Sequence, residues 1–292
     1  MVYLAIVSLI WAFSFGLIGS SLANLDSFFV ATIRLACAGL LFLPFLRLKQ
    51  LGLFSCLRLF IYGAIQFGLM YALYMKAFQY LPSHLVALFS ILTPIYVVLI
   101  HDLRHRSFSI RYFIAALLSV IAAATIKVEA LPSGSIWFGF CLMQVAGLSF
   151  AFGQIAYRDW KQSHPMLLDR SAFSILAFGG MVTAGLFSLV FADTDKLQVT
   201  NTQWQSIFYL GFIASGLGFF LWNKGASQTN PGILAVFNNA VVPLAMFVSL
   251  FVFGEISELT DENLFRLGIG SSLLVMAVVS TSTLKSERIK NL

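Results

Sequence analysis

Ten stretches of about twenty apolar residues follow one another along this 292-residue chain. A helix needs about 20 apolar residues to cross about 30 Å of hydrocarbon. The chain is 59% hydrophobic but only 10% charged, which is too little polar surface to cover a soluble core and argues against a soluble enzyme, a nucleic-acid binder or a disordered chain. We therefore predict an all-α integral membrane protein in a lipid bilayer, with spans at 2–22, 27–46, 59–80, 82–102, 108–128, 135–158, 170–192, 204–226, 231–254 and 264–284.

The distribution of Lys and Arg predicts how these spans are oriented. If the N-terminus is cytoplasmic, only Lys127, Lys196 and Arg266 of the 18 basic residues lie in outer segments. Arg34 and Lys76 lie within spans, and the other thirteen lie in inner segments. Cytoplasmic loops carry an excess of basic residues, so both termini are predicted to be cytoplasmic.

Two segments about 149 residues apart resemble each other. Pro82 opens the fourth predicted span and Pro94 interrupts it, with the same spacing of 12 residues as Pro231 and Pro243 in the ninth. This repeat divides the chain into two units of five spans, 1–128 and 129–292. Because five is odd, the second unit enters the membrane from the opposite side, as in many secondary transporters, whose substrate binds near the midplane between the halves.

The inner proline of each pair predicts a helix break. Proline frees the carbonyl four residues earlier, which belongs to Ser90 for Pro94 and to Asn239 for Pro243. A freed carbonyl in hydrocarbon needs a partner from protein, water or ligand. The two breaks therefore indicate either a paired binding site facing a wet cavity or structural kinks satisfied by neighbouring side chains.

Polar and aromatic residues within the spans are candidates to line such a cavity. Amide and hydroxyl side chains offer neutral donors and acceptors, and aromatic rings offer flat walls. Each could instead hold helices together or face lipid. The predicted substrate-binding residues are Trp11, Ser14, Tyr71, Ser90, Gln144, Asn223, Asn238 and Asn239.

Three cations within or near the spans could bind a carboxylate: Arg34, Lys76 and Lys224. For Arg34 we favour a structural role, paired with carbonyls or directed toward Asp26. The two lysines lie close enough to opposite faces to extend to the surface.

No Asp or Glu lies deep within a predicted span, which disfavours proton coupling and cationic substrates and favours a neutral or anionic one. There is no P-loop and no hydrolase motif in the sequence. The three Cys and four His form no cluster with metal-ligand spacing. We predict a non-enzyme without cofactor or metal that does not use ATP and takes a small-molecule substrate.

Segments in both halves resemble the EamA type of the drug/metabolite transporter superfamily. They are "LIWAFSFG" at 9–16, Arg34 early in the second span, "LTP" at 92–94, and "VVP" at 241–243 followed by "FVFGE" at 251–255. Within that superfamily, other segments are similar to bacterial biotin transporters: "WAFSF" at 11–15, "LDSFF" at 25–29, "LFLPFLR" at 41–47, "ASGLGFFLWNKGA" at 214–226 and "FNNAVVP" at 237–243.

This resemblance implies a multi-pass protein of the bacterial inner membrane that imports biotin by alternating access, with a monomer sufficient for transport. The residues are compatible with biotin, because amides can pair with its ureido ring, apolar walls suit its thiophane ring, and a cation suits its carboxylate. Only the resemblance selects biotin over another small amphipathic acid. Export of amino acids or other metabolites, which the superfamily also performs, is the alternative, and a receptor or scaffold that does not transport is a more remote one.

Overall fold

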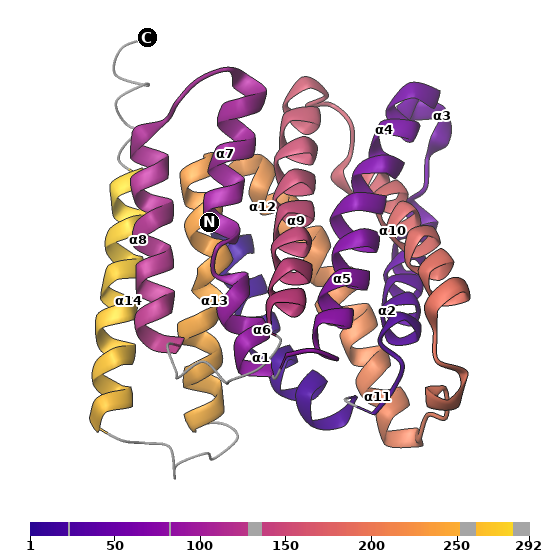
Figure 1. Cartoon of the computed structure of the whole chain (residues 1–292). Coiled ribbons are helices and arrows are strands. Elements are labelled where there is room, and N and C mark those ends of the chain that lie inside the picture. The colour runs from indigo at the N-terminus through magenta and orange to yellow at the C-terminus, as the bar shows by residue number, and fades with distance from the viewer. Residues whose placement is uncertain (23, 82, 128–135, 252–260, 283–292) are drawn as a thin grey trace.

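The computed structural model describes residues 1–22, 24–81, 83–127, 136–251 and 261–282, and every regular element in this part of the chain is a helix (Figure 1). Seven helical segments there are long and apolar enough to cross a membrane: Ser27–Phe45, Leu53–Ala77, Trp137–Ser163, Asp169–Phe191, Asn201–Gln228, Pro231–Val248 and Leu264–Thr281. Val2–Ser14 and Ile110–Ile126 are shorter apolar helices. The prediction of an all-helical membrane protein is confirmed.

The helices, in chain order, are α1 (Val2–Ser21), α2 (Ser27–Phe42), α3 (Leu48–Leu51), α4 (Leu53–Gly63), α5 (Met70–Ala77), α6 (Ser83–Ser90), α7 (Thr93–His105), α8 (Ile110–Lys127), α9 (Trp137–Ser163), α10 (Asp169–Phe191), α11 (Asn201–Tyr209), α12 (Gly218–Gln228), α13 (Pro231–Phe251) and α14 (Asp261–Ser282). Short 3₁₀ turns η1 (Leu43–Phe45) and η3 (Thr194–Lys196) follow α2 and α10. Two π-helical segments, η2 (Ala64–Leu69) and η4 (Leu210–Leu217), join α4 to α5 and α11 to α12.

The third, sixth and eighth predicted spans are longer than expected, at 53–77, 137–163 and 201–228. The predicted unit boundary at 128/129, the end of the ninth span at 252–254 and the end of the tenth at 283–284 fall partly or wholly outside the described residues.

The helices stand side by side, with α8 and α14 at one edge of the bundle and α10 with α4 at the other (Figure 1). Contacts between the two halves follow a reciprocal pattern. Helix α1 packs on α12 and α13, just as α9 packs on α5 and α7, and α2 packs on η4 as α10 packs on η2. Helix α2 also packs directly on α10, and α8 packs on α14.

One end of the bundle, here called the basic end, carries α3 and the α7–α8 and α9–α10 connections, at the top of Figure 1. Its basic residues include Arg47, Arg104, Arg106 and Lys161. At the opposite end, Asp26 caps α2 by accepting a hydrogen bond from the Phe29 backbone N–H at 2.8 Å.

The fourth predicted span is broken into α6 and α7, as the proline in its middle predicts. The Ser90 carbonyl that Pro94 frees accepts a hydrogen bond from the Thr93 hydroxyl at 2.7 Å. The next carbonyl, that of Ile91, accepts from the Asn239 side-chain amide at 3.0 Å. The second half of the bundle therefore satisfies a break in the first.

The prediction of a matching break at Pro243 is wrong, because α13 continues through this proline to Phe251. A proline within a helix removes one backbone hydrogen bond but does not require the chain to leave the helix when neighbouring helices hold it on both sides. Helix α13 is held in this way, since it packs against α1, α7, α8 and α14.

Glycines allow the π segments to approach their neighbours closely. A Cβ on Gly63, directly before η2, would lie 1.9 Å from the Leu176 carbonyl oxygen of α10, and one on Gly68 within η2 would lie 2.5 Å from the Cβ of Thr183 on α10. In the other half, a Cβ on Gly211 would lie 2.7 Å from the Cβ of Cys37. Both π segments therefore pack backbone-close against α10 or α2, a mode typical of membrane helices.

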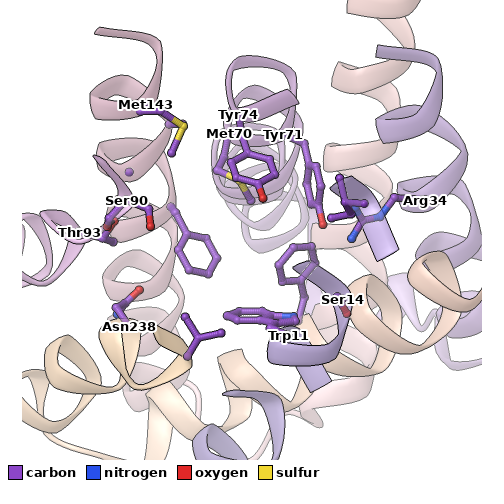
Figure 2. A pocket seen from close by; sticks show the side chains of 16 residues that line it. Trp11, Ser14, Arg34, Met70, Tyr71, Tyr74, Ser90, Thr93, Met143 and Asn238 are labelled. Atoms are coloured by element: carbon purple, nitrogen blue, oxygen red, sulfur yellow. Dashed lines mark hydrogen bonds between the residues drawn. The ribbon is translucent and has the colours of Figure 1, made fainter. Parts of the chain in front are cut away.

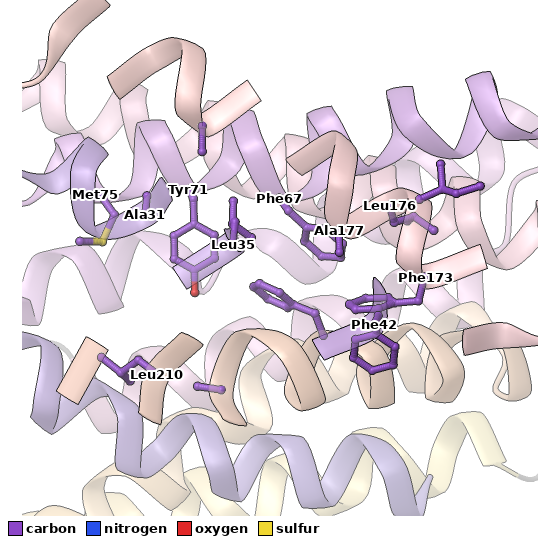
Figure 3. Packing of buried hydrophobic residues seen from close by; sticks show 14 of the residues in the cluster. Ala31, Leu35, Phe42, Phe67, Tyr71, Met75, Phe173, Leu176, Ala177 and Leu210 are labelled. Carbon is purple, nitrogen blue, oxygen red and sulfur yellow. The ribbon is translucent and has the colours of Figure 1, made fainter. Parts of the chain in front are cut away.

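The largest buried apolar cluster fills the space between these same helices (Figure 3). Phe42 and Phe173 meet edge to face with ring centroids 4.7 Å apart, and Phe67 stacks on Phe219 at 4.5 Å. Tyr71 and Phe219 belong both to this cluster and to the cavity described below. The cluster therefore fixes one wall of the cavity.

We expect the substitution Gly63→Ala to destabilise the fold by about 1–3 kcal/mol, because the added methyl group overlaps the backbone of α10. The control is Gly268→Ala on α14, where a Cβ meets nothing within 4 Å. Thermal unfolding in detergent compares the two variants. Unfolding of the Gly63 variant at or above the temperature of the Gly268 variant would contradict the proposed packing.

Candidate binding site

A cavity of about 150 Å³ lies in the centre of the bundle, between helices of both halves (Figure 2). We call it the central cavity. It is lined by Trp11, Ser14, Ile18, Arg34, Met70, Tyr71, Tyr74, Ser90, Thr93, Met143, Ala146, Gly147, Phe150, Phe219, Asn238 and Val241.

Helical periodicity brings these residues to the cavity. Trp11, Ser14 and Ile18 recur at intervals of three and four residues along α1, so they share one face. On α9, the same spacing joins Met143 to Gly147 and Phe150. Each helix thus presents one face to the cavity.

Arg34 is the only cation among the described residues of the lining and is 2% exposed. Its Nε donates a hydrogen bond to the Ser215 hydroxyl at 3.3 Å, and its guanidinium carbon lies 4.8 Å from the ring centroid of Tyr71. The Tyr71 hydroxyl lies 3.4 Å from the same Ser215 oxygen. In the described part of the chain, Arg34 forms no ion pair, and its Nη1 is buried without a hydrogen-bond partner.

The expected partner of Arg34 on the structural interpretation, Asp26, is engaged elsewhere. Its carboxylate accepts from the backbone N–H groups of Phe29 and, at 3.1 Å, Asp193. Because an unpaired buried charge is costly, a cation in this position is suited to bind an anion that enters the cavity.

Trp11 forms an aromatic wall between the two sides of the cavity. Its indole Nε1–H donates to the Ala214 carbonyl of η4 at 3.0 Å, so its only polar group is satisfied. Its ring centroid lies 4.8 Å from that of Trp222, 5.7 Å from Phe219 and 6.0 Å from Phe150. Trp11 therefore offers a flat apolar surface to a ligand.

Neutral polar residues lie on the side of the cavity away from Arg34: Ser90, Thr93 and Asn238 (Figure 2). The Asn238 amide forms two hydrogen bonds with Gln154 on α9, each 3.1 Å long. The break between α6 and α7 exposes Ser90 and Thr93 to the cavity at the point where the helix changes direction.

Of the eight predicted substrate-binding residues, the cavity lining includes Trp11, Ser14, Tyr71, Ser90 and Asn238. Gln144, Asn223 and Asn239 are not part of it. Gln144 accepts a hydrogen bond from the Tyr96 hydroxyl at 2.8 Å. Asn239 is 1% exposed and donates to the carbonyls of Ile91 and Ser119, so it joins α13 to the α6–α7 break and to α8.

Asn223 forms a buried pair with Gln66, which donates to it at 3.1 Å. The Gln66 side chain packs tightly against Gly153. A Cβ added at Gly153 would lie only 2.1 Å from the Cβ of Gln66. The remaining amide groups of the pair, Gln66 Oε1 and Asn223 Nδ2, are buried without partners in the structure. This pair joins the two π-containing spans next to the cavity.

The two predicted lysines lie away from the cavity lining, at equivalent places in the two halves. Lys76 lies 5.7 Å from the ring centroid of Phe28, and Lys224 lies 4.8 Å from that of Tyr3. Both have cation–π contacts near helix ends, as expected for side chains that extend toward a surface.

Sequence reasoning missed several lining residues, mainly Met70, Met143, Phe150 and Phe219, because their side chains are apolar. The signal that could have found them is spacing. Phe150 occupies the place of Trp11 in the second half, and Phe219 lies 148 residues after Tyr71, the same offset that relates Lys76 to Lys224.

Ion pairs join helices at the basic end. Arg104 on α7 contacts Asp159 on α9 at 2.8 Å, and Arg158 lies 3.5 Å from the same carboxylate. Arg158 also donates to the Thr229 carbonyl at 3.1 Å, after the end of α12. Between this network and Phe219 of the cavity lies Trp222, which is fully buried. These contacts therefore hold α7, α9 and the end of α12 together at the basic end.

Comparison with known proteins identifies the class to which this fold and cavity belong. The model of the EamA-like transporter family matches residues 1–128 and 134–281. The chain belongs to this family and is a membrane transporter, not an enzyme. The resemblance noted in the sequence is thus confirmed.

Three curated relatives are similar over most of their length. The chain is 37% identical to the biotin transporter of Salmonella typhimurium and 36% identical to that of Escherichia coli K12, in each case covering 87% of this chain and 85% of the relative. It is 35% identical to a probable biotin transporter of Pseudomonas aeruginosa, covering 95% and 96%. A crystal structure with 16% identity shares the fold, with a TM-score of 0.76 over 97% of this chain and 96% of that one.

We expect Asn239→Ala to lower stability by about 1–3 kcal/mol, because the carbonyls of Ile91 and Ser119 lose a buried donor. Thermal unfolding in detergent measures this loss. The folded fraction should bind substrate with unchanged affinity, since Asn239 does not line the cavity. A changed affinity with unchanged unfolding would instead indicate that Asn239 contacts the ligand.

Proposed function

We propose that this transporter imports biotin across the bacterial inner membrane by alternating access, without ATP. The single observation that carries the proposal is the unpaired, buried guanidinium of Arg34 at the wall of an aromatic cavity. Biotin is a small acid with an apolar body, so its carboxylate would supply the missing partner of this cation. The similarity to three proteins described as biotin transporters or probable biotin transporters supports this choice of substrate.

The proposed transport cycle uses ten crossings, arranged as inverted five-helix repeats over residues 1–128 and 129–292. Three observations support this arrangement: the family model matches the chain twice, contacts between the halves are reciprocal, and π segments lie at equivalent places, 64–69 and 210–217. On this proposal both termini are cytoplasmic and the basic end faces the cytoplasm.

With that orientation, the ion pairs of Arg104 and Arg158 with Asp159 lie on the cytoplasmic side of the bundle. Substrate would enter from outside, and these ion pairs would separate when the halves rock to release it.

We expect external thiol labelling to distinguish the two ends. After replacement of Cys37, Cys56 and Cys141, a membrane-impermeant reagent should label Asp195→Cys in intact cells but should label Ser107→Cys only after lysis. Labelling of Ser107→Cys in intact cells would overturn the proposed orientation.

Uptake of labelled biotin into a strain that lacks its own biotin synthesis and transport tests the function. We expect the chain to support uptake and Arg34→Gln to raise the apparent KM about ten-fold or more, because a charge-assisted hydrogen bond contributes about 1.5–3 kcal/mol. The control is Arg58→Gln, whose exposed side chain lies over Phe54 outside the cavity lining. Both variants must reach the membrane in normal amounts.

Two outcomes would contradict the proposal. Absence of biotin uptake by the unmodified chain, together with outward flux of amino acids from loaded proteoliposomes, would favour the exporter. An unchanged KM in the Arg34 variant would exclude Arg34 as the carboxylate partner.

A further inference from the structure

The polar groups of the central cavity are divided by charge and by hydrogen-bonding type. Arg34 lies on one side, beside Tyr71 and Ser14. Its guanidinium can donate hydrogen bonds but cannot accept them. Asn238 and Thr93 lie on the other side, with Trp11 between the two groups (Figure 2). None of the described residues that line the cavity is acidic, so a cation lies on one side and only neutral polar groups lie on the other.

The amide orientation of Asn238 is fixed by three hydrogen bonds. Its Nδ2 donates to the Gln154 side chain at 3.1 Å and to the Leu234 carbonyl at 2.8 Å, which uses both N–H groups. The Leu234 carbonyl can only accept, so it identifies which end of the amide is nitrogen. The Oδ1 atom accepts from Gln154 at 3.1 Å and retains a second lone pair. Asn238 can therefore offer a ligand only an acceptor.

The Thr93 hydroxyl, like the Asn238 amide, can offer a ligand only an acceptor. Its hydroxyl hydrogen is donated to the Ser90 carbonyl at 2.7 Å, so its oxygen can only accept from a ligand. Gly147 on α9 lies directly beside this oxygen, since a Cβ on Gly147 would lie 3.1 Å from Thr93 Oγ1. The absence of a side chain at Gly147 keeps the acceptor accessible.

We propose that the central cavity binds its substrate in one orientation, with the carboxylate at Arg34 and an N–H-bearing ring at the acceptors of Asn238 and Thr93. This inference rests on the proposed function and adds the residues that decide specificity. A carboxylate on the Asn238 side would meet the committed acceptors of Asn238 and Thr93 and would lie away from Arg34, so the reversed orientation is disfavoured. Gln154, which is fully buried and absent from the lining, is a positioning residue that holds the Asn238 oxygen toward the ring.

Three probes separate the two sides in a binding assay on the purified full chain. Biotin has both the ureido N–H groups and the carboxylate. Biotinol keeps the ring system but has an alcohol in place of the carboxylate. Lipoate keeps a carboxylate on a chain of the same length, but its dithiolane ring has no N–H.

We expect Asn238→Ala to weaken biotin and biotinol binding about ten-fold while leaving the affinity for lipoate unchanged. Arg34→Gln should do the reverse, weakening biotin and lipoate but not biotinol. Gln154→Leu should shift the ratio of biotin to lipoate affinity in the same direction as Asn238→Ala, by a smaller factor. Unchanged lipoate binding in the Asn238 and Gln154 variants also verifies that their cavities are folded.

The matched control is Gln144→Leu, which removes the same side chain from the same helix but outside the cavity lining. It should leave the order of the three probes unchanged. Equal weakening of biotin and lipoate by Asn238→Ala would overturn the proposed orientation, as would a change in the ratio by Gln144→Leu equal to that by Gln154→Leu. Failure of the unmodified chain to bind biotin would instead overturn the proposed function itself.

Discussion

A polar group within an apolar bundle must find its partner inside the protein, and the structure around the cavity follows from this constraint. The break between α6 and α7 frees two carbonyls. Thr93 at the start of α7 donates to one of them, and Asn239 of α13 donates to the other. Because Asn239 also reaches the Ser119 carbonyl on α8, one side chain holds three helices together. The break can then persist and present Ser90 and Thr93 to the cavity.

Close backbone approach complements these hydrogen bonds. In lipid, helices gain little from burying apolar side chains against one another, so contact between small residues contributes much of the packing. The π segments carry glycines that fit against α10 and α2, and the wider turn of η4 also leaves the Ala214 carbonyl available to Trp11. Two π segments at equivalent places next to a cavity agree with the tendency of π-bulges to occur at functional sites.

Not every buried polar group has a partner: the Gln66–Asn223 pair keeps two unpaired amide groups, and Arg34 keeps an unpaired charged one. Ser215 and Tyr71 hold the guanidinium in place without neutralising it. On the far side of the cavity, hydrogen bonds with Gln154 fix the Asn238 amide, and the Ser90 carbonyl takes the Thr93 hydroxyl hydrogen. These acceptors therefore cannot turn a donor toward a second anion. On the proposed function, a fixed positive charge opposite fixed acceptors would select both the ligand and its direction, through preorganised groups rather than flexible ones.

The sequence by itself determined the membrane class, the approximate spans and the family, because hydropathy, charge distribution and motif spacing are properties of the chain alone. It also indicated most of the polar residues near the cavity, since polar side chains in apolar spans are few. It could not separate Asn238 from Asn239. Consecutive residues of a helix point about 100° apart, so the rotation of α13 against its neighbours decides which amide meets the cavity and which holds the α6–α7 break. The same holds for Pro94 and Pro243, which have the same spacing in the sequence: only one of them breaks its helix, because the packing around each helix decides whether the break is tolerated.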